Sequence, residues 1–223
     1  MIPFACAAAL LFTADSAVHL AAVANRRETL RRVTKLLLMP LLALTFCLFW
    51  TSLSPESVPW LVVAALALGF GGDAFLLDRH FSPGLPLGLA CFFAGHVLYM
   101  IQIWCLTPAP SWRAAVLVPL VYAAVAVLFY RKLYPHLPGK YRIPALAYTL
   151  MLCALSSSAV MSAFSLHIGS TIVLAGTLLF MLSDSILSFE VFRGESRHGN
   201  VKVMSSYIAA QACLSAGFLV WMA

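Results

Sequence analysis

The chain has 223 residues, of which 62% are hydrophobic and only 10% are charged. Soluble domains are about 25% charged, so this chain has too few ionisable side chains to cover a water-exposed surface, and its apolar excess has to face lipid. The composition predicts a polytopic membrane protein and excludes a water-soluble enzyme. The net charge of +6 does not indicate a nucleic-acid partner, because the basic residues occupy short links between apolar stretches.

The apolar stretches predict eight transmembrane helices in a single integral membrane domain, residues 1–223. Each stretch approaches the roughly 20 apolar residues that cross the hydrocarbon core. In chain order the spans are expected at residues 3–24, 34–51, 59–77, 86–105, 113–130, 143–163, 169–189 and 201–222. No Lys or Arg precedes the first span, so we expect it to be retained and not cleaved as a signal peptide. The fold class is therefore an all-α membrane bundle.

The distribution of Lys and Arg predicts the orientation. If successive links lie on alternate sides, the first, third, fifth and seventh links hold 13 of the 14 Lys and Arg residues, and only Arg113 lies on the other side. By the positive-inside rule those four links are cytoplasmic, and both termini lie on the non-cytoplasmic side. The short links and the lack of an N-x-[ST] sequon favour a bacterial inner membrane.

Three carboxyls, Asp15, Asp73 and Asp184, fall within the spans. Each costs about 2.5–3.5 kcal/mol at a helix centre, so each is expected either to join helices through polar contacts or to take part in function. Asp73 lies late in the third span and Asp184 late in the seventh, which puts both in the cytoplasmic half at similar depth. Asp15 has His19 one turn later, and we expect a local ion pair or hydrogen bond between them.

Other polar side chains are predicted to gather with the two deep acids in one inward-facing cavity. They are Lys35, His96, Tyr99, Tyr207 and Gln211. Lys35 opens the second span, where it is expected to snorkel to the interface, to pair with one of the acids or to meet a lipid phosphate. A lone His96 in mid-span more often meets a hydroxyl than a metal, and no HxxxH or HExxH spacing occurs. We therefore expect no metal and no cofactor.

Five segments occur in an order and at separations that are specific in combination: TKLLLMPLL (34–42), GFGGDAFLL (69–77), FFAGHVLYM (92–100), GTLLFMLSDSILSFEVF (176–192) and VMSSYIAAQ (203–211). Together they make the chain resemble the YhhN-like lysoplasmalogenase family. The resemblance implies an integral membrane hydrolase that cleaves the vinyl-ether bond of lysoplasmalogens to a fatty aldehyde and glycerophosphoethanolamine or glycerophosphocholine. The residues that match the family's polar positions are Lys35, Asp73, His96, Tyr99, Asp184, Tyr207 and Gln211.

Vinyl-ether hydrolysis needs a proton donor for the outer carbon and an anion near the resulting oxocarbenium ion, as two carboxyls supply in glycosidases. We assign these roles to Asp73 and Asp184, without deciding which is the acid, and expect His96 to orient them. The expected substrate-binding residues are Lys35, Tyr99, Tyr207 and Gln211. A lysophospholipid would lie with its tail among the helices and its headgroup at the interface.

Two other functions are compatible with buried polar residues in a helical bundle. A transporter or proton pathway would use Asp and His as a relay, but the outer halves of the spans are nearly free of ionisable side chains. A metal-dependent lipid hydrolase would use His96, His19 and the acids as ligands. Proton donation to carbon does not call for a metal, which favours the two-carboxyl mechanism.

Overall fold

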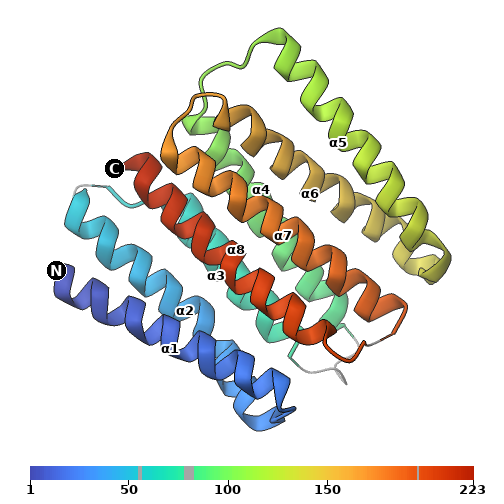
Figure 1. Ribbon diagram of the computed structural model, residues 1–223, viewed down its shortest axis with the longest axis horizontal. Coiled ribbons are helices and arrows are strands. Elements are labelled where there is room, and N and C mark those ends of the chain that lie inside the picture. Colours follow the sequence, from blue (N-terminus) through green and yellow to red (C-terminus); the bar gives the residue numbers. More distant parts are fainter. Residues whose placement is uncertain (55–56, 78–82, 195) are drawn as a thin grey trace.

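The computed structural model describes residues 1–54, 57–77, 83–194 and 196–223, and these residues form helices and no strand. Eight α-helices follow one another in Figure 1: α1 (Ile2–Ala24), α2 (Glu28–Leu53), α3 (Trp60–Phe75), α4 (Gly84–Leu106), α5 (Trp112–Leu133), α6 (Arg142–Ala163), α7 (Ile168–Phe192) and α8 (Gly199–Met222). Two short 3₁₀ turns, Tyr134–His136 and Gly139–Tyr141, connect α5 to α6. The predicted all-α fold is confirmed.

Each predicted span coincides with one of these helices. Seven of them are long and apolar enough to cross a membrane, whereas α3 has only 16 residues. The largest difference is at α2, which begins at Glu28 and not at residue 34. Arg31 donates to Glu28 at 2.7 Å across this first turn, and such a pair one turn apart supports a helix. Helix α2 therefore begins within the polar link, about one to two turns before its apolar part.

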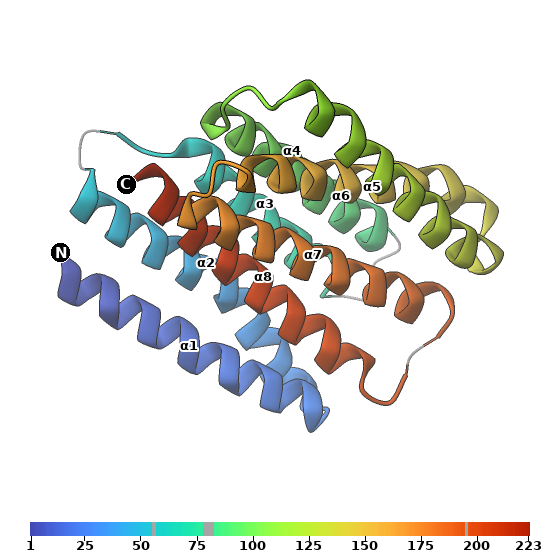
Figure 2. The ribbon, with the colours of Figure 1, turned by 45° about the horizontal axis from the view of Figure 1, so that its top comes forward.

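Helices consecutive in the chain run antiparallel, and α8 lies in the interior against α1, α2 and α7 (Figures 1 and 2). The contact between α7 and α8 depends on glycine. A Cβ on Gly176 would lie 2.9 Å from the backbone nitrogen of Leu214, and a Cβ on Gly217 would lie 2.7 Å from that of Val173. Small residues are what allow membrane helices to pack backbone to backbone. This close contact fixes α7, which carries Asp184, against α8, which carries Tyr207.

Both termini lie at one end of the bundle (Figure 1). The links that join α1 to α2, α5 to α6 and α7 to α8 lie at the opposite end, which we call the basic end because Lys and Arg concentrate there. Arg113 begins α5 at the end of the termini, and Arg79 falls outside the described residues. The alternation agrees with the predicted topology, and the side of the membrane that the basic end faces remains a prediction.

Helix α5 is the outermost helix of the bundle (Figure 1). Only Ala126 and Leu133 are buried along its whole length, although the helix is apolar enough to span a membrane. Its exposed apolar side chains are suited to lipid contact. It packs mainly on α6, and this interface holds the cavities described below.

Candidate active site

Asp73 forms a buried ion pair near the end of α3. The Lys35 ammonium nitrogen of α2 lies 3.2 Å from Oδ1 of Asp73, and the side chains are 9% and 3% exposed, respectively. The Tyr207 hydroxyl of α8 donates to Oδ2 of the same carboxylate at 2.8 Å. Both carboxylate oxygens therefore have a partner, and three helices are joined at this point. Removing one member of such a pair leaves an uncompensated buried charge.

A second polar contact lies beside this ion pair. Tyr99 of α4 donates to Oε1 of Gln211 on α8 at 2.8 Å. Gln211 and Tyr207 approach α3 at Gly69, where a Cβ would meet Nε2 of Gln211 at 3.2 Å and the Tyr207 hydroxyl at 3.6 Å. The absent side chain thus makes room for two polar groups. We call the five residues Lys35, Asp73, Tyr99, Tyr207 and Gln211 the ion-pair cluster.

An aromatic layer joins the ion-pair cluster to Asp184. The ring of Tyr207 meets that of Phe180 edge to face, with centroids 5.5 Å apart. Phe180 meets His96 in the same way at 4.4 Å, and His96 meets Tyr148 at 5.7 Å. His96 is only 1% exposed, and neither ring nitrogen has a hydrogen-bond partner in the described part of the chain. It lies between the two acids as a packed ring.

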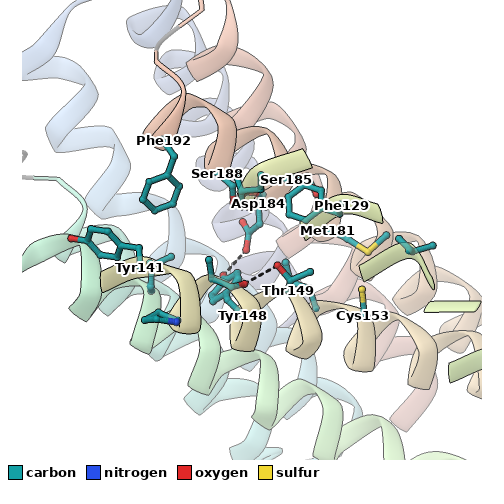
Figure 3. A pocket seen from close by; sticks show the side chains of 16 residues that line it. Phe129, Tyr141, Tyr148, Thr149, Cys153, Met181, Asp184, Ser185, Ser188 and Phe192 are labelled. Carbon is teal, nitrogen blue, oxygen red and sulfur yellow. Dashed lines mark hydrogen bonds between the residues drawn. The ribbon is translucent and has the colours of Figure 1, made fainter. Parts of the chain in front are cut away.

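Asp184 lies on α7 and accepts a short hydrogen bond at Oδ2 from the Tyr148 hydroxyl of α6 (Figure 3). Both residues line a cavity of about 660 Å³, counted with the part open to the surroundings, whose walls come from α4, α5, α6 and α7. Apolar side chains such as Phe129 and Met181 form most of its surface (Figure 3). We call this the Asp184 cavity.

Two hydroxyls that line the Asp184 cavity are engaged within their own helices. Thr149 donates to the carbonyl of Ala145, and Ser188 donates to that of Asp184, each at 2.8 Å. Tyr141 and Ser185 carry further hydroxyls of the lining. Asp184 supplies the carboxyl of this lining and Tyr148 bonds to it, so these two are its principal reactive groups. The arrangement can transfer a proton inside a pocket that is otherwise apolar.

Two arginines adjoin, in sequence, residues that line the basic end of this cavity. Tyr141 and Phe192 line it there. Next to them in sequence are Arg142, which begins α6, and Arg193, which follows α7. The guanidinium of Arg142 stacks 4.4 Å from the centroid of the Tyr134 ring. Exposed cations at the end of an apolar cavity suit an anionic headgroup attached to a hydrocarbon chain.

The structure distributes the predicted site residues differently from the single cavity expected from sequence. Asp184 lines the cavity, whereas Asp73 is not among the residues that line it. Lys35 turns inward to Asp73 and does not snorkel. His19 approaches the Thr34 hydroxyl at 2.8 Å and not Asp15, whose Oδ2 is buried without a partner among the described residues. The acids thus belong to two environments linked by aromatic rings.

Tyr148 was not among the predicted site residues, although it makes the only side-chain hydrogen bond shown to Asp184 in the described part of the chain. A signal was available. Tyr148 lies six positions into α6 and Asp184 eight positions before the end of α7, so both are about 9–12 Å from the basic end at about 1.5 Å per residue.

Among the described residues, no group of three or more His, Cys, Asp or Glu side chains could hold a metal ion.

Comparisons with known proteins give two matches. A family model described as the YhhN family matches residues 30–218. The curated lysoplasmalogenase TMEM86B of Rattus norvegicus is 27% identical over 176 residues, which cover 79% of this chain and 68% of that protein. No solved structure matches the chain.

Proposed function

The chain belongs to the YhhN family, and from that premise we propose that it is a lysoplasmalogenase, which hydrolyses the vinyl-ether bond of lysophospholipids. Family membership agrees with the resemblance found in the sequence, and a relative named lysoplasmalogenase supports a hydrolase of this family. The observation that carries the proposal is the Asp184–Tyr148 pair in a largely apolar cavity. Arg142 and Arg193 adjoin its lining residues Tyr141 and Phe192 in sequence.

The reaction requires one group that gives a proton and takes one back. Asp184 protonates the outer carbon of the vinyl ether, which leaves an oxocarbenium ion and the Asp184 carboxylate. Water adds to the cation and returns a proton to Asp184, giving a hemiacetal. The hemiacetal collapses to the fatty aldehyde and the glycerophospho alcohol, so atoms and charges balance without a redox partner.

The environments of the two acids support different roles. Asp184 has a neutral phenol as its partner in an apolar cavity, the kind of site in which enzymes keep a carboxylic acid ready to donate a proton. Asp73 is paired with the Lys35 ammonium and with Tyr207. We therefore assign proton transfer to Asp184. Asp73 is assigned the role of a fixed anion that does not contact the substrate.

Asp73 acts on the cavity through the aromatic layer. It holds Tyr207, whose ring packs on Phe180, and Phe180 packs on His96. His96 in turn packs on Tyr148, the partner of Asp184. In this proposal Asp73 and His96 position the acid. Lys35, Tyr99 and Gln211 stabilise the ion-pair cluster on the other side of the aromatic layer from Asp184.

The cations at the end of the cavity support binding of the headgroup phosphate. Because Lys35 is engaged by Asp73, we assign the phosphate to Arg142 and Arg193, with Lys140 nearby. Guanidinium groups bind phosphate well because they offer several N–H donors in one plane. Either ethanolamine or choline would extend beyond the phosphate into water.

We further propose that the basic end faces the cytoplasm of a bacterial cell and that the chain crosses the inner membrane eight times. The concentration of Lys and Arg at one end supports this orientation. The substrate would then come from the inner leaflet, with its phosphate at the basic end and its vinyl ether just below.

The test is to incubate purified protein, with and without a chelator, with alkenyl and acyl lysophospholipids and to measure fatty aldehyde and fatty acid. We expect aldehyde from the alkenyl lipid in both conditions and nothing from the acyl lipid. Fatty acid from the acyl lipid would indicate another lipase. Activity lost to the chelator and restored by zinc would favour the metal-dependent alternative, and proton flux in liposomes without hydrolysis would favour the relay.

A further inference from the structure

A second cavity lies on the same side of the bundle as the Asp184 cavity, toward the end of the termini. It occupies about 1410 Å³, counted with its open part, and its walls come from α4, α5, α6 and the residues between α4 and α5. We call it the outer cavity. Pro119 and Ala123 line it from α5, and Ala154 and Met161 line it from α6.

Cys153 of α6 lines both cavities. Along α6, Tyr148 and Thr149 face the Asp184 cavity, and Ala154 and Met161 face the outer cavity. The two spaces therefore follow one another along the α5–α6 interface, with Cys153 at the neck between them. Helix α5 forms the outer wall throughout, and it is the least buried of the eight helices.

Three of the four hydroxyls that line the outer cavity, those of Thr107, Ser157 and Ser158, are occupied within the protein, and Tyr122 carries the fourth. Ser158 accepts from the Trp104 indole nitrogen at 2.8 Å and donates to the carbonyl of Ala154 at 2.8 Å. Thr107 donates to the carbonyl of Ile103 at 2.6 Å. A polar ligand would find few partners here and would lose its hydration. The outer cavity therefore suits a hydrocarbon.

The length of the two cavities fits one lipid chain. Tyr148 and Met161 are 13 positions apart on α6, which is about 20 Å at about 1.5 Å per residue. One leaflet of the bilayer has half of a hydrocarbon core of about 30 Å, so a membrane lipid chain spans about 15 Å. A chain whose first bond lies at Asp184 can extend past Cys153 and remain within the outer cavity.

We propose that the α5–α6 interface is the binding channel for the alkenyl chain of the substrate and that Cys153 and Ala123 set how long a chain it accepts. This inference rests on the proposed function and names the part of the protein that selects the substrate by chain length. The carboxyl of Asp184 lies at one end, where the bond is cut, and most of the remaining lining is apolar.

The test is to narrow the channel from each wall and to compare two substrates. Cys153→Trp adds bulk from α6, and Ala123→Trp adds bulk from α5, where Ala123 is exposed and tolerates a larger side chain. Each variant is assayed with a hexadecenyl and a hexenyl lysolipid. The matched controls are Cys6→Trp and Ala14→Trp, which change exposed residues of α1.

We expect kcat/KM for the hexadecenyl lipid to fall about 10–200-fold in both variants, the range over which an apolar pocket discriminates by fit. In Ala123→Trp, whose site lines the outer cavity alone, the hexenyl value stays near wild type and shows that this variant is folded. Equal loss on both substrates, or loss on neither, in the folded Ala123→Trp variant would overturn the channel. If wild-type protein releases no aldehyde from either substrate, the proposed function itself fails.

Discussion

The burial of the Lys35–Asp73 pair predicts how much the free energy of unfolding of the bundle depends on one charge. In Asp73→Asn the ammonium of Lys35 keeps its buried position but loses its counterion, and a broken buried pair costs about 3–5 kcal/mol. Lys35→Met leaves the carboxylate unpaired and should cost a similar amount. The double variant removes both charges, and its Asn can still bond Tyr207, so we expect most of the stability to return.

Thermal unfolding in detergent measures these effects. A protein of 150–250 residues loses about 2–4 °C in Tm per kcal/mol, so each single variant should unfold about 6–20 °C below wild type. The interaction free energy from the double-mutant cycle should exceed about 2 kcal/mol, within the range found for contacting residues. Single variants that unfold within a degree of wild type would show that the pair is solvated, contrary to the burial seen here.

The same variants separate the two roles proposed for Asp73. A residue that only positions the aromatic layer can be replaced once stability is restored, so the double variant should keep measurable aldehyde release. A carboxylate that touches the reacting bond cannot be replaced in this way. A double variant that is as stable as wild type but has no turnover would move Asp73 into the chemistry itself.

Four further predictions concern other parts of the molecule. Asp184→Asn should lower kcat about 10²–10⁴-fold, the value of a general acid, with little change in Tm; retention of a tenth of the activity would refute its role. Arg142→Ala should raise KM for the lysolipid with kcat nearly unchanged, since phosphate binding is the same in the ground and transition states; a fall in kcat alone would argue against it. Gly217→Val should prevent close packing of α7 on α8 and reduce the yield of folded protein, whereas wild-type yield would show that the helices can separate. A single cysteine at Arg27 in a cysteine-free background should resist an impermeant reagent in intact cells, and one at Pro110 should react; the reverse pattern would invert the topology.

Hydropathy predicted the helices closely because span length is a local property. The span predicted at residues 169–189, for example, lies within α7 (Ile168–Phe192), which begins one residue earlier and ends three residues later. The depth of each side chain in the membrane was equally predictable, because its position along a helix converts directly to a distance from the helix end. For this reason Asp73 and Asp184 were recognised as deep acids before their partners were known.

The partners were not predictable, because sequence gives the depth of a side chain but not the direction in which it points around the helix axis. In a soluble helix the apolar stripe marks the buried face, but lipid is as apolar as the interior of the bundle. The sequence therefore did not show that Asp184 faces Tyr148 of α6 and not Asp73. The environment of Lys35 stayed undecided for a related reason, since a position near a helix end does not distinguish snorkelling from an inward ion pair.

The weak attachment of α5 has a consequence for how the two products leave. On the proposed chemistry one product is a hydrophobic aldehyde and the other a water-soluble phosphodiester, and the cavity system has an apolar end and a basic end. The aldehyde can move sideways past α5 into the bilayer, while the phosphodiester escapes among the cations into the aqueous phase. Departure into separate phases makes recombination of the products negligible. A reaction that consumes only water therefore becomes effectively irreversible without any coupled source of energy.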